Sequence, residues 1–145
     1  MATPQPFVAL YRNRRTGEVL IEKYGKSSFF RGALEPLGGA QVIPADVLRS
    51  SGLARVRDSL EAFRSEPELP RDWKPESTVH LSPSQFFQVG ITLLQDGSLE
   101  LDPNHRGERG GYVGSKKDER LLVRPEASAE EFLSLLEQAF GQCAA

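Results

Sequence analysis

The chain has 145 residues, of which 26% are charged and 39% hydrophobic, and its formal net charge is −2. This length predicts one domain, which buries about two thirds of the surface that its unfolded chain exposes. Domains that bind nucleic acid are usually strongly basic, so we expect no direct nucleic-acid partner. Because Cys143 is the only cysteine, an intrachain disulfide is excluded and a reducing compartment is the simpler assumption.

The first residues lack the pattern of a secretion signal, and the apolar runs are shorter than a membrane span. We therefore expect a cytoplasmic protein with no membrane partner. Charge is unevenly spread, since residues 1–45 carry six Lys/Arg against three Asp/Glu and residues 81–145 carry six against ten. The acidic half either attracts a basic partner or is an ordinary solvated surface.

Two β-prone runs, 7–11 and 19–24, are joined by a polar connector and predict a β-hairpin. Its tip would carry Arg12, Arg14 and Arg15. Such arginines either contact an anion or form an exposed, charged turn, and the sequence leaves both readings open.

A short strand over 41–43 is expected next, followed by a helix that begins near Pro44, a residue tolerated in a first turn. Gly52 predicts a break in this helix. The apolar residues beyond it recur at spacings of three, four and three, which predicts an amphipathic helix packed on a sheet. These residues are Leu53, Val56, Leu60 and Phe63.

The segment Ser82–Gln85 has the pattern of a capping box with proline in the first turn, and it predicts a short helix through Phe87 that ends at Gly90. Asp96-Gly97 lies between two apolar runs and is the strongest hairpin signal in the chain.

A strand over 119–124 and a last helix, capped by Ser128 and Glu131, complete the expected elements. Together they predict a single α+β domain over residues 1–145. Its sheet is mostly antiparallel and built from hairpins, with helices packed on it.

The connection between the strands at 99–101 and 121–123 is the most conspicuous part of the chain, because four glycines lie among many polar residues over 102–114. Tyr112 lies there among charged residues, as an aromatic anchor of a protein interface would. The alternative is an ordinary surface loop. The candidate partner-binding residues are Asp102, Glu108, Tyr112, Asp118 and Glu119.

The same segment contains residue types that a small hydrolase or nuclease would use, namely His105 with Asp102 and either Arg106 or Arg109. Their spacing matches no catalytic motif. Metal ligands at helical or hairpin spacing are not found either. We therefore expect no enzymatic activity, no catalytic residues, no metal and no cofactor.

The residues from Tyr11 to Gly32 resemble the N-terminal segment of the immunity proteins of bacterial contact-dependent growth inhibition systems. The segment 99–114 and the closing helix, with Ala139 and Cys143, are similar too. The resemblance implies a small cytoplasmic protein without enzymatic activity that binds and blocks the toxin domain of a cognate secreted effector, often a nuclease. A generic protein-interaction or regulatory module is the main alternative.

Overall fold

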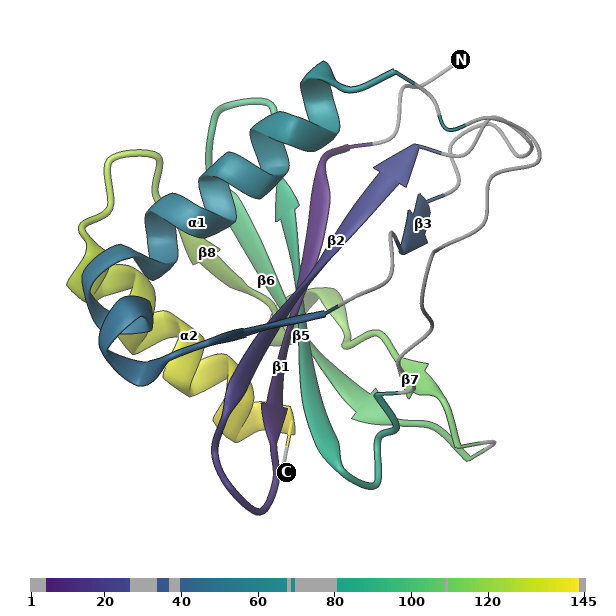
Figure 1. The fold of residues 1–145 in the computed structure, drawn as a ribbon. Helices are drawn as coiled ribbons and strands as arrows, with labels where there is room; N and C mark the ends of the chain where they lie inside the picture. The colour runs from purple at the N-terminus through teal and green to yellow at the C-terminus, as the bar shows by residue number, and fades with distance from the viewer. Residues whose placement is uncertain are drawn as a thin grey trace.

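An antiparallel sheet with two helices against one face forms the framework of the molecule (Figure 1). The computed structural model describes residues 5–26, 34–36, 40–67, 69, 81–108 and 110–143. The strands are β1 (Phe7–Asn13), β2 (Val19–Lys26), β3 (Leu34–Pro36), β4 (Gln41–Ile43), β5 (Phe86–Leu93), β6 (Leu99–Arg106), β7 (Tyr112–Val113) and β8 (Leu121–Val123). The helices are α1 (Ala45–Ser65), the short 3₁₀ turn η1 (Lys117–Glu119) and α2 (Ala129–Cys143). The expected α+β class is confirmed.

The strands follow the order β3-β2-β1-β5-β6-β7, and two further strands extend the same edges, because β4 also pairs with β2 and β8 with β6. Leu10 in β1 lies opposite Ile21 on one side and Val89 on the other. The expected hairpins β1–β2 and β5–β6 therefore supply four adjacent strands of the sheet.

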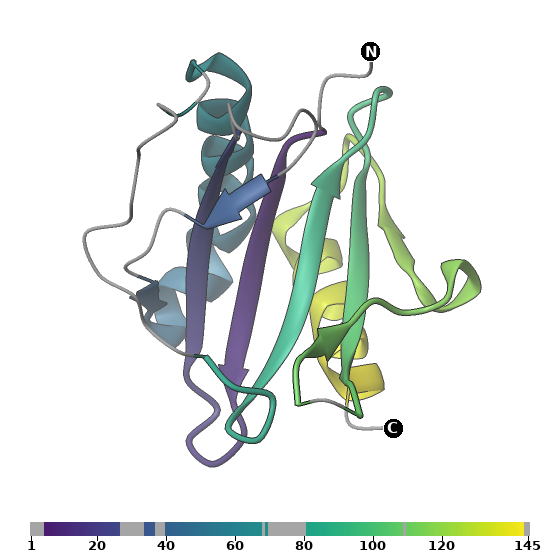
Figure 2. The ribbon, with the colours of Figure 1, turned by 90° about the vertical axis from the view of Figure 1, so that its right-hand side faces the viewer.

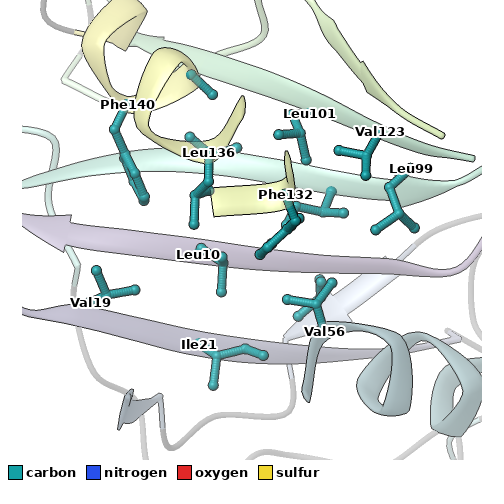
Figure 3. Close-up of a cluster of buried hydrophobic side chains, with 14 of the residues drawn as sticks. Leu10, Val19, Ile21, Val56, Leu99, Leu101, Val123, Phe132, Leu136 and Phe140 are labelled. Atoms are coloured by element: carbon teal, nitrogen blue, oxygen red, sulfur yellow. The ribbon is translucent and has the colours of Figure 1, made fainter. Parts of the chain in front are cut away.

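Both helices cover the same face of the sheet, and the main apolar core lies between them and the strands (Figure 3). Val56 and Leu60 of α1 are buried there, and Phe63 of the same helix is buried too, which confirms the apolar stripe predicted for this helix. From α2, Phe132, Leu136 and further residues enter the same core. In α2, the Ser128 hydroxyl accepts the N–H of Glu131 at 3.1 Å, as expected for the cap.

The predicted break in α1 is confirmed as a kink between two helical segments. Ser51 has non-helical backbone angles, φ −142° and ψ 15°, inside the helix. At the next residue, Gly52, a Cβ atom would lie 2.9 Å from Leu48 Cδ1. Glycine at this position therefore permits the close packing of consecutive turns at the kink.

The helix predicted from Ser82 to Gly90 is wrong. The capping-box residues form a turn in which the N–H groups of Gln85 and Phe86 both donate to Ser82 O at 3.0 Å, and the strand β5 begins directly at Phe86. Pairing with both β1 and β6 outweighs the local cap signal. Gly90 lies within this strand, where a Cβ atom would lie 2.9 Å from the Phe7 ring.

The loop expected over 102–114 is shorter than predicted, because β6 continues through Arg106 and β7 pairs back onto its end. Pro103 lies inside β6 opposite Val89. On the other side of β6, residues 99–101 pair with β8 and 105–106 pair with β7, so Pro103 lies between the two pairings. A proline without an N–H donor is tolerated at such an interruption. No helix in the described part of the chain is long and apolar enough to cross a membrane.

Candidate functional site

The segment that follows β6 folds back along the edge of the sheet as β7, η1 and β8 (Figure 2). Asp102 fastens it, because its carboxylate accepts the backbone N–H of Ser115 at 2.9 Å and also the Ser115 hydroxyl. Arg120 adds an ion pair to Glu100 at 3.2 Å, and its Nε lies 3.8 Å from Asp102. Asp102, a predicted partner-binding residue, is thus engaged within the chain.

His105 makes a second link in this segment, since its Nε2 lies 3.1 Å from the Glu119 carboxylate. Glu119, another predicted partner-binding residue, is therefore also engaged. Strand alternation places Asp102 and His105 on opposite faces of β6. The structure thus separates the two groups that the hydrolase hypothesis requires to act together, while Arg109 lies outside the described residues.

Tyr112, a further predicted partner-binding residue, is partly buried against the sheet. Its hydroxyl lies 2.8 Å from Leu81 O and 3.2 Å from Phe86 O, and its ring contacts Tyr11 edge-on with centroids 5.9 Å apart. Burial raises the pKa of Tyr112 above its ordinary value, although the nearby charge of Arg14 acts in the opposite direction. The side chain fastens β7 to the start of β5.

The remaining candidates, Glu108 and Asp118, are exposed and make no ion pair with the residues that the structure describes. Two large apolar side chains are exposed at the same edge of the sheet, Val113 in β7 at 53% and Leu122 in β8 at 55%. They lie on opposite faces of this edge, because Val113 pairs with His105 and Leu122 with Glu100. We refer to these four residues as the β7–β8 edge. Of the five predicted residues, the structure therefore leaves two exposed carboxylates without an ion pair among the described residues, and it adds two exposed apolar residues that the sequence analysis did not single out.

A polar chain crosses the face of the sheet opposite the helices, and it was not predicted. Tyr11 Oη donates to Glu22 at 2.8 Å and accepts from Gln88 Nε2 at 2.7 Å, while Asn104 Nδ2 donates to Gln88. Tyr24 also donates to Glu22, at 3.2 Å. Burial is the main cause that raises the pKa of both tyrosines.

This polar chain follows the strand register. Gln88 lies directly opposite both Tyr11 and Asn104, and Glu22 is the diagonal neighbour of Tyr11. The carboxylate and the Tyr11 ring are buried. The one available signal was Glu22 itself, a charged residue directly after the apolar run 19–21, although its partners include residues of distant strands.

The hairpin arginines are separated by the structure. Arg12 lies within β1 and pairs with Glu137 of α2, whereas Arg14 and Arg15 are exposed in the turn. No group of three or more His, Cys, Asp or Glu side chains in the described ranges is placed to hold a metal ion.

Cys143 is buried, and its thiol donates to Gln88 O at 3.3 Å. Burial raises the pKa of this thiol to about 11. At neutral pH the side chain is therefore a protonated, packed thiol and a poor nucleophile.

Comparison with known proteins bears on the fold alone. No protein-family model matches this chain, and no curated protein matches it either. Among solved structures, it is similar to NMB0488 from Neisseria meningitidis, described as a protein of unknown function, with a TM-score of 0.63 and 16% sequence identity over 99% of each chain. The two chains thus share one architecture from end to end.

Proposed function

We propose that this chain is a cytoplasmic immunity protein, which binds the toxin domain of a contact-dependent growth inhibition effector and neutralises it without catalysis. The observation that carries the proposal is the β7–β8 edge, a segment in which Val113 and Leu122 are exposed on short strands and the carboxylates of Glu108 and Asp118 are accessible. Apolar side chains with a charged surround are typical of protein interfaces. The family resemblance of the sequence supplies the identity of the partner.

The acidic balance of residues 81–145, with ten Asp/Glu against six Lys/Arg, suits a basic toxin such as a nuclease, although exposed Lys116 and Lys117 lie next to Asp118. Opposite charges on two protein surfaces steer their encounter and accelerate association. Three contacts hold the segment in place and favour a preformed surface. They join Asp102 to Ser115, His105 to Glu119, and Tyr112 to Leu81. A preformed surface loses little conformational entropy on binding.

The test is co-purification with the C-terminal toxin domain encoded beside this chain, followed by titration of the domain's nucleic-acid cleavage. A binding inhibitor abolishes cleavage at one equivalent per toxin. Loss of cleavage at far less than one equivalent would indicate turnover, and it would reopen the hydrolase hypothesis for His105. Failure to form any complex would refute the proposal and favour an interaction module for another protein.

Salt dependence tests the electrostatic part separately. We expect the association rate to fall markedly between low and physiological ionic strength, since salt screens charges at protein surfaces. An association rate that does not change with salt would refute steering by charge, while a measured complex would still support binding.

A further inference from the structure

Two arginine–aromatic stacks lie side by side where β1 ends, close to the C-terminal end of α2. The Arg12 guanidinium lies over the Phe140 ring at 4.5 Å from its centroid, and the Arg14 guanidinium lies over the Phe87 ring at 4.3 Å. Arg12 and Phe87 are themselves cross-strand partners. The two stacks are thus neighbouring units with the same chemistry.

In the first stack the guanidinium has a carboxylate partner, because Glu137 accepts hydrogen bonds from both terminal nitrogens of Arg12. The hydrogen bonds from Arg12 are the main cause that lowers the pKa of this carboxyl group below its ordinary value. The second stack has the arginine and the ring, but within the described residues the Arg14 side chain has neither a hydrogen bond nor an ion pair. Among the described residues, the N–H groups of the Arg14 guanidinium therefore have no carboxylate partner, whereas those of Arg12 bind Glu137.

Arg14 is also held in position before any partner arrives. Its backbone N–H donates to Gln85 O at 2.9 Å, which ties the turn to the residue before β5. Asn13 Oδ1 accepts the N–H groups of Arg15 and Thr16 at 2.9 and 3.0 Å, and Gly17 adopts φ +77°. A guanidinium stacked on a ring and mounted on a fixed turn loses little entropy when it binds.

The surroundings favour an anionic group. Arg15 in the turn and Arg106 at the end of β6 are exposed and make no ion pair with the described residues. The β1–β2 turn, which carries Arg14, and the end of β6 lie at the same end of the sheet (Figure 2). The exposed carboxylates of Glu18 and Glu108 offset this charge only in part, with two negative charges against three positive ones.

We propose that Arg14, stacked on Phe87, is the docking point for an aspartate or glutamate side chain of the toxin domain. The inference rests on the proposed function, since the toxin supplies the carboxylate. At this point a positive charge of the chain binds a negative charge of the toxin, whereas the carboxylates of the β7–β8 edge bind positive charges of the toxin. Arginine is enriched among the residues that dominate protein interfaces, and its fork binds a carboxylate through two parallel hydrogen bonds.

The test measures the dissociation constant of the full chain with the toxin domain for wild type and three variants. Arg14→Gln removes the charge and the fork, while Arg14→Lys retains the charge alone. The matched control is Lys23→Gln, because Lys23 is also exposed, has no ion pair with the described residues, and lies roughly 20 Å farther along β2.

We expect Arg14→Gln to raise the dissociation constant about tenfold or more, the scale of a lost charge-assisted hydrogen bond. Arg14→Lys should recover only part of this loss, and Lys23→Gln should bind like wild type. Equal binding by wild type and Arg14→Gln would overturn the docking point while the proposed function stood. Equal weakening by Lys23→Gln would also overturn it, because net charge alone would then explain the effect. If the wild-type chain formed no complex, both proposals would fall.

Discussion

The two faces of the central strands are stabilised by different interactions, although they are built from alternate residues of the same strands. Leu10 and Ile21 face the helices and lie in the apolar core, whereas their chain neighbours Tyr11 and Glu22 face the other way and join the polar chain. Apolar burial is non-directional and scales with area. Buried hydrogen bonds depend on geometry and are costly when one partner is lost. The helix-covered face should therefore respond to volume, and the opposite face to the identity of single polar atoms.

The largest effect is expected from Phe132→Ala on the helix-covered face. Phe132 is fully buried in α2, and its removal leaves a cavity between the helix and the sheet. We expect the free energy of unfolding to fall by about 3–5 kcal/mol, measured by urea denaturation. A loss below about 1 kcal/mol would contradict the dependence of this face on volume.

A smaller effect is expected from Glu22→Ala on the polar face, because the hydroxyl groups of Tyr11 and Tyr24 both lose their acceptor. We expect a loss of about 1–3 kcal/mol in the free energy of unfolding. The control is Glu22→Gln, which retains one acceptor oxygen and should lose less. If both variants were as stable as wild type, the polar chain would contribute nothing to the fold.

A pH effect is expected where α2 reaches the sheet. The pKa of Cys143 is raised from 9.0 to about 11 in the folded chain, so the unfolded thiol loses its proton first. Its contribution to stability is fully present below about pH 9 and is lost as pH rises towards 11. Urea denaturation at pH 8 and pH 10.5 should therefore show a larger loss for wild type than for Cys143→Ala. Equal losses would show that the pKa of the thiol is the same in the folded and the unfolded chain. Any effect of the tyrosines is common to both proteins and cancels in this comparison.

The smallest effect on stability is expected at the β7–β8 edge. Leu122→Ser should change the free energy of unfolding by no more than about 0.5 kcal/mol, because the side chain is 55% exposed. It should nevertheless weaken toxin binding. Val42→Ser is the matched control, since Val42 is 45% exposed on β4 at the other edge of the sheet. Equal toxin binding by wild type and both variants would remove Leu122 from the interface.

Much of the framework follows from local signals. Asp96-Gly97 predicted the β5–β6 turn, the spacing of Val56, Leu60 and Phe63 predicted the buried side of α1, and Ser128 predicted the start of α2. Such signals act over a few residues, and no distant partner opposes them here. The Ser82–Gln85 cap failed for the opposite reason, because its neighbours pair with strands far away in the sequence.

The candidate site could be predicted only in outline. The sequence located the segment, but it did not show that Tyr112, predicted as an interface anchor, also contacts Leu81 and Tyr11. Likewise, Gln88 and Asn104 give no sign in the sequence that they meet Tyr11 and Glu22. Polar residues acquire their roles from partners on other strands, and a linear pattern does not contain that information.

Both edges of the sheet are divided into short strands. On β2, β4 pairs with residues 19–21 and β3 with 24–26; on β6, β8 pairs with 99–101 and β7 with 105–106. Each of these outer strands has only two or three residues. A long, flat edge is a template on which further copies of a chain can add strand by strand into aggregates. Interrupted edges limit such growth, so the described sheet can present apolar side chains to a partner with little risk of polymerising with itself.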